Sequence, residues 1–363
     1  MVTSVSQRGR NNYSEQAADR IVMAARRAMA DFLNVEADAV VFGRSATQIN
    51  FDMARAIGRA LVPGDEIVVS RLDHDANIRP WVIAAEANDL TVRWIDFDKR
   101  SGELRLEHVR EALSERSRLV AVTGASNFLG TKPDIPAIAA EAHRVGAELY
   151  LDAVAYAAHE LVDFAQLGVD YVVCSPYKFC GPHLGVLGST VERLSGLVPD
   201  KLRPSTMRVP NRFELGTLPY EALAGVAETV EFLADLTVGP GSRRERLERS
   251  YRALAAHESA LFDELVKGIE QTAGVRRIGS PGSCVPTVLF AVDGRTPEQT
   301  CRELGARDVA VMGGSFYAIE AAEFAGLGEG GVRAGIAPYT NAEDVARLLE
   351  AVADLSPSSV ARS

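Results

Sequence analysis

The sequence has little cysteine, no excess of basic charge and no long apolar run. Four cysteines in 363 residues are too few for a disulfide framework, which indicates a reducing compartment and predicts a cytoplasmic location. Lys and Arg number 39 against 49 Asp and Glu, and the resulting formal charge of −10 argues against a nucleic-acid binder, which needs a basic face. No apolar stretch approaches the ~20 residues of a membrane span, and the N-terminus lacks the apolar stretch of a signal peptide. We therefore expect neither a nucleic-acid nor a membrane partner.

The chain does contain a repeated alternation of short β-branched runs with helical stretches rich in Ala, Glu and Arg. This alternation predicts an α/β fold with a mostly parallel sheet. A helix from Ser14, expected as its N-cap, to about Phe32 precedes it. The predicted strands are Ala39–Phe42, Ile67–Val69, Val92–Ile95, Leu119–Val122, Leu149–Leu151 and Tyr171–Val173.

The pattern changes after about Leu218, where longer helices replace the alternation. This change predicts a large domain over residues 14–236 and a smaller C-terminal α+β domain over residues 237–363. The later elements are expected at 220–236 and 242–272 (helices), Thr287–Val292 and Val332–Ile336 (strands) and 341–355 (helix). The tail from Ser356 to Ser363 is of low complexity.

Polar residues follow several of the predicted strands, at the edge where open parallel sheets bind ligands. Small polar residues from Gly43 to Gln48 open a helix, and a helix N-terminus offers free N–H groups to a phosphate. A plain N-cap would give the same pattern. Asp152 follows an apolar strand, where a buried carboxylate needs a cationic or hydrogen-bonding partner.

Lys178 follows another strand, within Ser175-Pro176-Tyr177-Lys178. Partial desolvation lowers the pKa of a lysine and makes it a nucleophile for carbonyl carbon, although a single lysine more often lies at the surface. His74 and Asn127 follow further strands on the same rim. Together these residues make the set that pyridoxal 5′-phosphate requires: a Schiff-base lysine, a carboxylate for the pyridinium nitrogen and a phosphate cradle.

The ordered set of motifs resembles the class V aminotransferases, and within them the cysteine desulfurase-like branch, close to group II cysteine desulfurase and selenocysteine lyase. The resemblance runs from about Ser14 to about Leu355. The motifs that carry it are Ala46-Thr47, Asp73 to Trp81, Ser126 to Thr131, Asp152-Ala153-Val154 and Ser175 to Lys178.

The resemblance implies a fold type I pyridoxal-phosphate enzyme, a homodimer with active sites at the interface, acting on a small amino-acid substrate. It implies catalytic roles for Lys178, Asp152 and His74, and a substrate-carboxylate clamp at Arg333. It implies no metal. The implied cofactor-binding residues are Ala46, Thr47, His74, Asn127, Asp152, Ser175, Tyr177, Lys178 and Thr217, the last reaching the phosphate of the neighbouring subunit.

Three departures from the family pattern bear on the reaction. Desulfurases carry a mobile-loop cysteine before the clamping arginine, whereas residues 311–333 contain none. Ala155 stands where the family offers Gln or His near the cofactor 3′-oxygen. The family also usually has a longer N-terminal segment, so this pocket is unusual or the start is misassigned. Candidates to replace the missing side chain are Tyr156, His159 and His183, and the cysteines are Cys174, Cys180, Cys284 and Cys301.

These features predict a C–S lyase or desulfurase-like β-elimination that does not pass through a loop-cysteine persulfide. Aminotransfer or epimerisation uses the same residues and stays open as an alternative. A non-catalytic relative is a further alternative, which Ala155 favours slightly and the intact Lys178 and Arg333 oppose.

Overall fold

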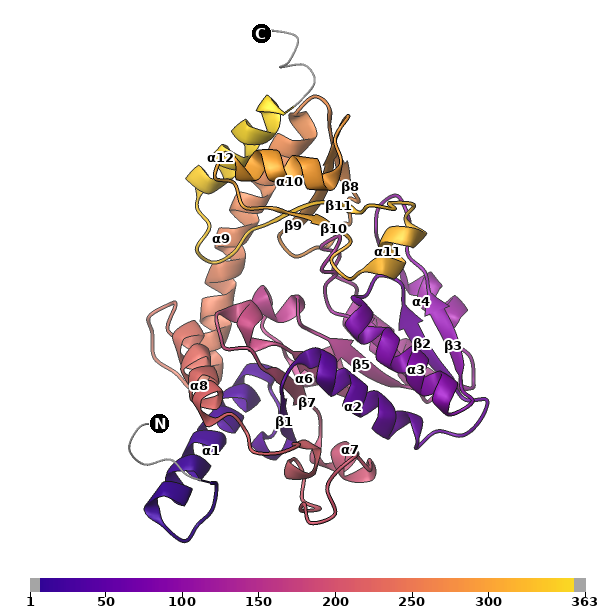
Figure 1. The fold of residues 1–363 in the computed structure, drawn as a ribbon, viewed down its shortest axis with the longest axis vertical. Coiled ribbons are helices and arrows are strands. Elements are labelled where there is room, and N and C mark those ends of the chain that lie inside the picture. Colours follow the sequence, from indigo (N-terminus) through magenta and orange to yellow (C-terminus); the bar gives the residue numbers. More distant parts are fainter. Residues whose placement is uncertain (1–6, 356–363) are drawn as a thin grey trace.

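The computed structural model describes residues 7–355 and contains two β-sheets joined by a long helix (Figure 1). The larger sheet has seven strands in the order β1-β7-β6-β5-β4-β2-β3. Four neighbouring pairs, from β3 through β6, are parallel, and β7 and β1 are antiparallel to their neighbours. The strands are β1 (Val40–Gly43), β2 (Glu66–Ser70), β3 (Thr91–Ile95), β4 (Ser117–Thr123), β5 (Glu148–Asp152), β6 (Tyr171–Cys174) and β7 (Gly185–Gly188).

This arrangement confirms the predicted mostly parallel α/β sheet. Because β1 is antiparallel to β7 and β7 to β6, β1 runs in the same direction as the parallel strands. The carboxyl ends of β1, β2, β4, β5 and β6 therefore meet at one edge, where a parallel sheet binds ligands.

Helices cover both faces of the large sheet and complete its core. Trp81 and Tyr150 are fully buried on one face and pack edge to face, while α1 covers the other face with Phe32 and Met29. The helices around this sheet are α1 (Tyr13–Leu33), α2 (Ala46–Gly58), α3 (Arg79–Ala87), α4 (Leu106–Ala112), α5 (Ile135–Arg144), α6 (Phe164–Leu167), α7 (Val191–Gly196) and α8 (Tyr220–Ala234).

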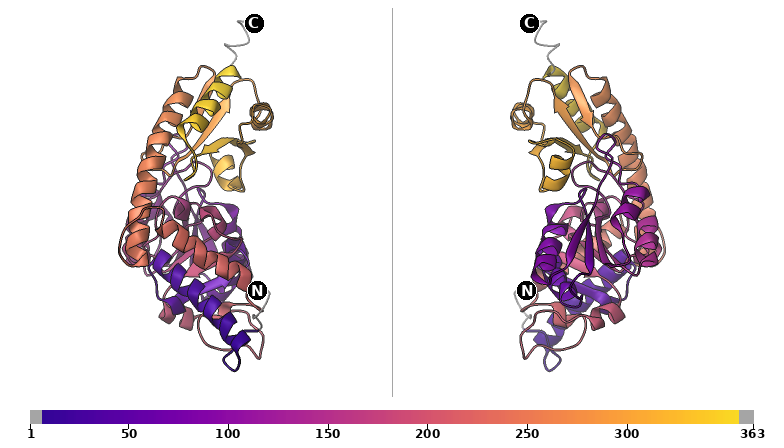
Figure 2. Two further views of the ribbon diagram at one scale, coloured as in Figure 1. Left: turned by 90° about the vertical axis from the view of Figure 1, so that its left-hand side faces the viewer. Right: turned by 90° about the vertical axis from the view of Figure 1, so that its right-hand side faces the viewer.

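The smaller sheet is entirely antiparallel, in the order β10-β11-β9-β8. Helix α9 runs from the larger sheet to the smaller one (Figure 2). Short helix α11 instead lies against the large sheet, where Glu320 pairs with Arg71 at 2.9 Å. The elements of this part are α9 (Arg243–Gln271), β8 (Val275–Ile278), β9 (Thr287–Val292), α10 (Pro297–Gly305), β10 (Met312–Gly314), α11 (Ile319–Phe324), β11 (Gly331–Gly335) and α12 (Ala342–Asp354).

Several element boundaries differ from the sequence prediction for local reasons. The first helix is capped by Asn12, whose side chain accepts from the N–H of Glu15, so Ser14 lies inside the helix and is not its cap. Asp152 is the last residue of β5 and does not follow it. Strands β7, β8 and β10 were not predicted, because Gly-rich or charged four-residue and three-residue runs carry no period-two pattern. The division at residues 236 and 237 stays a prediction, and the low-complexity tail lies outside the described residues.

A buried ion pair ties α1 to the segment after α7. Arg26 Nη2 lies 2.6 Å from Glu214 Oε2, and the two side chains are 1% and 4% exposed. Glu214 also accepts a hydrogen bond of 3.0 Å from the N–H of Phe42 in β1. This contact fixes the chain just before Leu215–Thr217, the segment predicted to reach a second subunit.

Gly185 permits the close approach of β7 to the beginning of α2. A Cβ at this position would lie 2.3 Å from the carbonyl carbon of Ser45 and 2.6 Å from the nitrogen of Ala46. We expect Gly185→Ala to lower the free energy of unfolding by about 1–3 kcal/mol, because backbone must move to admit the methyl group. Gly196→Ala is the matched control, since its Cβ would meet nothing within 4 Å. Urea unfolding with equal midpoints for the two variants would contradict this packing.

Candidate active site

One cavity of about 350 Å³ lies at the carboxyl edge of the large sheet and brings together most of the predicted site residues. Ser45, Thr123, Met312, Phe316 and Tyr317 also line it and were not singled out from the sequence. The predicted residues that line it are Ala46, Thr47, His74, Asn127, Asp152, Ser175, Tyr177, Lys178 and Arg333. Thr217 does not line this cavity.

Asp152 lies at the end of β5 with its carboxylate buried. The N–H of Val154 donates to Asp152 Oδ1 at 2.8 Å, and no cationic side chain in residues 7–355 comes within ion-pair distance. Burial raises the pKa of Asp152 to about 6, opposed by that hydrogen bond and by the charge of Lys178. The carboxylate is therefore ready for a cation that enters the cavity.

Lys178 follows β6 in the short 3₁₀ turn Pro176–Phe179. Burial is the main cause that lowers the pKa of its amine, and the nearby charge of Arg333 lowers it further, while Asp152 acts in the opposite direction. Within the described chain, no hydrogen bond or ion pair occupies Lys178 Nζ, which lies 5.4 Å from the centroid of the Tyr177 ring. A partly desolvated, unpaired amine is a competent nucleophile and base.

His74 begins the turn that follows β2. Its Nδ1 accepts a hydrogen bond of 3.0 Å from the N–H of Ala76, which places the proton of the neutral ring on Nε2. Burial lowers the pKa of His74, and the charges of Lys178 and Arg333 lower it further. The ring faces the cavity as a neutral aromatic surface.

The neighbouring Asp73 is structural. It is fully buried, accepts from Asn77 Nδ2 at 2.7 Å and accepts from the N–H of Thr123 at 3.0 Å. Burial raises its pKa well above the ordinary value. These bonds join the ends of β2 and β4 and fix the loop that carries His74.

The beginning of α2 faces the same cavity through Ser45, Ala46 and Thr47. Ser45 caps the helix by accepting from the N–H of Gln48 at 3.1 Å. The N–H groups of a first helical turn have no intrahelical partner, and the positive end of the helix dipole adds to them. This end of the cavity suits an anion.

Arg333 comes from β11 and crosses to the large sheet, where its Nη1 donates to the carbonyl of Asn127 at 2.5 Å. Asn127 Nδ2 donates to the carbonyl of Phe316 at 2.8 Å, and Asn127 Oδ1 is buried without a partner among the described residues. No carboxylate of the described chain pairs with Arg333. Within the described chain, the site thus keeps a guanidinium without an ion-pair partner and an unpaired amide oxygen for a ligand.

None of the four cysteines lines this cavity. Cys174 is buried beneath it, and burial raises the pKa of its thiol strongly. Cys180 is exposed, in a left-handed conformation two residues after Lys178.

The candidates to replace the side chain missing at Ala155 do not line the cavity either. Tyr156 packs on Gly124, His159 forms a hydrogen bond of 2.9 Å with Glu258, and His183 stacks on Tyr177.

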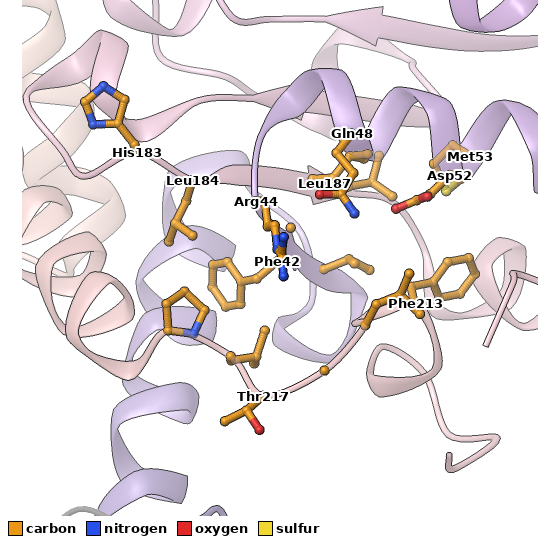
Figure 3. A pocket seen from close by; sticks show the side chains of 17 residues that line it. Phe42, Arg44, Gln48, Asp52, Met53, His183, Leu184, Leu187, Phe213 and Thr217 are labelled. Carbon is orange, nitrogen blue, oxygen red and sulfur yellow. The ribbon is translucent and has the colours of Figure 1, made fainter. Parts of the chain in front are cut away.

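A second cavity of about 590 Å³ lies beside the first and carries Thr217 (Figure 3). Arg44 approaches it from the turn before α2, Gln48 and Asp52 from α2 itself, and His183 from the loop after Lys178. The rings of His183 and Tyr177 stack with centroids 5.0 Å apart, and Tyr177 lines the first cavity while His183 lines the second.

The family model for aminotransferase class-V matches residues 3–348. Uncharacterized protein MT3887 of Mycobacterium tuberculosis is 30% identical over 94% of this chain and 86% of its own length. A probable cysteine desulfurase of Pseudomonas aeruginosa is 30% identical over 93% of this chain and 83% of its own. The apo structure of a cysteine desulfurase from Thermococcus onnurineus has the same fold, with a TM-score of 0.87, 24% identity and coverage of 98% and 88%.

The raised pKa of Asp152 makes a prediction for the ligand-free protein. A carboxyl whose folded pKa of about 6 exceeds its ordinary 3.8 is stabilised by its proton, so stability is lost as pH rises through this window. Between about pH 4 and pH 6, we expect the free energy of unfolding of Asp152→Asn to rise relative to that of wild type by on the order of 3 kcal/mol. Above about pH 6 the difference between the two proteins should stay constant. Urea unfolding at several pH values measures the gap, with exposed Asp308→Asn as control. A gap independent of pH would contradict the assignment.

Proposed function

This chain belongs to the aminotransferase class-V family, in its cysteine desulfurase-like branch, and we propose that it catalyses β-elimination at the C–S bond of an α-amino acid. It is an enzyme whose cofactor is pyridoxal 5′-phosphate. The observation that carries the proposal is one cavity that holds an unpaired Lys178 amine, a buried Asp152 carboxylate without a cationic partner, and Arg333.

The residues of the cavity fit this cofactor. Asp152 lacks a cationic partner within the described residues and would pair with a protonated pyridine nitrogen. The beginning of α2, with Ala46 and Thr47, would hold the phosphate, together with Ser175 and Tyr177. Lys178 would hold the aldehyde carbon, His74 would stack on the ring, and Asn127 would face the 3′-oxygen.

The chemistry needed from the chain's own residues is limited. The bound cofactor supplies a sink for the electron pair released at Cα. Arg333 binds the substrate α-carboxylate with its free N–H groups and so orients the Cα–H bond. Lys178 removes the Cα proton, and its lowered pKa increases the share of the amine that is neutral and able to act as a base. Asp152 would stabilise a positive charge at the pyridine nitrogen.

The cysteine positions support elimination without a persulfide on the enzyme. No thiol lines the cavity, and the segment that enters it after β10 carries Phe316 and Tyr317. Aminotransfer and epimerisation would use the same residues. Product analysis from several amino acids, with and without a 2-oxo acid, separates these three reactions, and the absence of a visible cofactor band would point to a non-catalytic relative.

We also propose a homodimer in which Thr217 contributes to the phosphate site of the partner subunit. Leu215 is 46% exposed, and Gly216 has a φ of 80° with nothing near its Cβ position, so this segment projects from the surface next to the second cavity. Glu214 anchors its base through Arg26. Sedimentation showing an active monomer would contradict this arrangement.

The four free cysteines support a cytoplasmic location, and no helix within residues 7–355 meets the length and hydropathy of a bilayer span.

The assignment of Lys178 is tested by covalent trapping. Borohydride reduction of the enzyme as isolated, followed by peptide mapping, should place the cofactor on Lys178, because its amine is the unpaired one in the cavity. Lys178→Ala should lose the visible absorbance band and turnover, the latter by several orders of magnitude. Exposed Lys267→Ala is the control and should keep both. A label on any other lysine would overturn the assignment.

The absence of a thiol from the cavity is tested by removing all four. A variant with Cys174→Ala, Cys180→Ser, Cys284→Ala and Cys301→Ala should keep at least about a third of the elimination rate, since no thiol contacts the reacting atoms. Selective loss of activity in Cys180→Ser alone, with the cofactor still bound, would instead establish a thiol-dependent desulfuration.

A further inference from the structure

The turn from Ser315 to Ala318 enters the active-site cavity in an unusual backbone conformation. Phe316 and Tyr317 have φ values of 55° and 61°, a region that bulky side chains rarely occupy. A bulky residue in this conformation is strained and persists only where its surroundings hold it. Two consecutive residues of this kind at a cavity wall indicate a role in the site.

Contacts to the large sheet hold this turn. The N–H of Asp75 donates to the carbonyl of Tyr317 at 2.8 Å, and Asn127 Nδ2 donates to the carbonyl of Phe316 at 2.8 Å. Just beyond the turn, Glu320 pairs with Arg71 at 2.9 Å and approaches Arg79 at 3.9 Å. The turn is thus fixed from both its carbonyl groups and the helix that follows.

The ring of Phe316 lies over the guanidinium of Arg333. Arg333 Cζ is 4.1 Å from the ring centroid, and Arg333 Nη1 donates to the carbonyl of Asn127. Asn127 in turn bonds the carbonyl of Phe316, which closes a ring of three contacts. The left-handed backbone of Phe316 therefore places its carbonyl on one partner and its ring on the other.

We propose that Phe316 is a positioning residue that sets the plane of Arg333 for the substrate α-carboxylate, an inference that rests on the proposed role of Arg333. A guanidinium stacked on an aromatic face keeps its charge and its in-plane N–H donors while losing rotational freedom. Two parallel donors in a fixed plane suit a carboxylate. Phe316 also approaches Phe128, with ring centroids 6.2 Å apart. The test must therefore distinguish the positioning of Arg333 from simple packing of the Phe316 ring.

The test compares two probes that differ only in the carboxylate. Equilibrium dissociation constants of L-alanine and of ethylamine are measured on the holoenzyme from its absorbance spectrum. Phe316→Leu keeps apolar volume but removes the π face, and Phe316→Ala removes both. We expect each variant to weaken L-alanine binding roughly five- to twentyfold and ethylamine binding less than twofold. Tyr339→Leu, at an 82% exposed ring in the smaller domain, should change neither.

Arg333→Ala separates the inference from the function on which it rests. If that variant retains the preference for L-alanine over ethylamine, Arg333 is not the clamp. The proposed role of Arg333 and the proposed role of Phe316 then both fail. If it loses the preference while Phe316→Leu and Phe316→Ala keep the wild-type value, the positioning role alone is overturned. Equal weakening of both probes in the Phe316 variants also overturns it, because packing would then be the only role of the ring.

Discussion

The site depends on one electrostatic constraint, a carboxylate buried at the end of a central strand without a cation of its own. Neighbouring strands surround Asp152, and a single backbone N–H of Val154 reaches it in the described chain. Burial and the charge of Arg333 meanwhile depress the pKa of Lys178 on the same cavity wall. Burial thus disfavours the charged form of both groups, and a cationic heteroaromatic ligand would supply the counter-charge that the Asp152 carboxylate lacks.

The rest of the fold serves to hold this edge in place. Asp73 ties the loop of His74 to β4, and Gly185 lets β7 approach the beginning of α2. Helix α11 and the turn before it connect β10 to β11 and pack against the large sheet. Arg333 on β11 therefore reaches the cavity from the smaller sheet, where it contacts the carbonyl of Asn127. The proposed substrate clamp and the proposed cofactor site therefore lie on one rim, although Lys178 and Arg333 are 155 positions apart in the sequence.

Local sequence patterns were sufficient to predict the strands that build the catalytic edge. The runs ending near Val122, Leu151 and Val173 lie in buried parallel strands, and the polar residues after them line one cavity. Three-residue and four-residue strands such as β10 lack a recognisable period, so the segment after β10 that brings Phe316 into the site could not be predicted. The left-handed turn arises from contacts with Asp75 and Asn127, which are distant in sequence. The only sequence signal for this turn was the aromatic pair Phe316-Tyr317 shortly after Gly313-Gly314.

The claim that Asp152 supplies the counter-charge of the cofactor is tested most directly by ¹⁵N NMR of ring-labelled pyridoxal phosphate bound to the protein. In wild type, the pyridine nitrogen should remain protonated up to at least about pH 8, because the buried carboxylate stabilises the cation. In Asp152→Asn the same nitrogen should be unprotonated across that range. An identical ¹⁵N shift and titration in the two proteins would contradict the account.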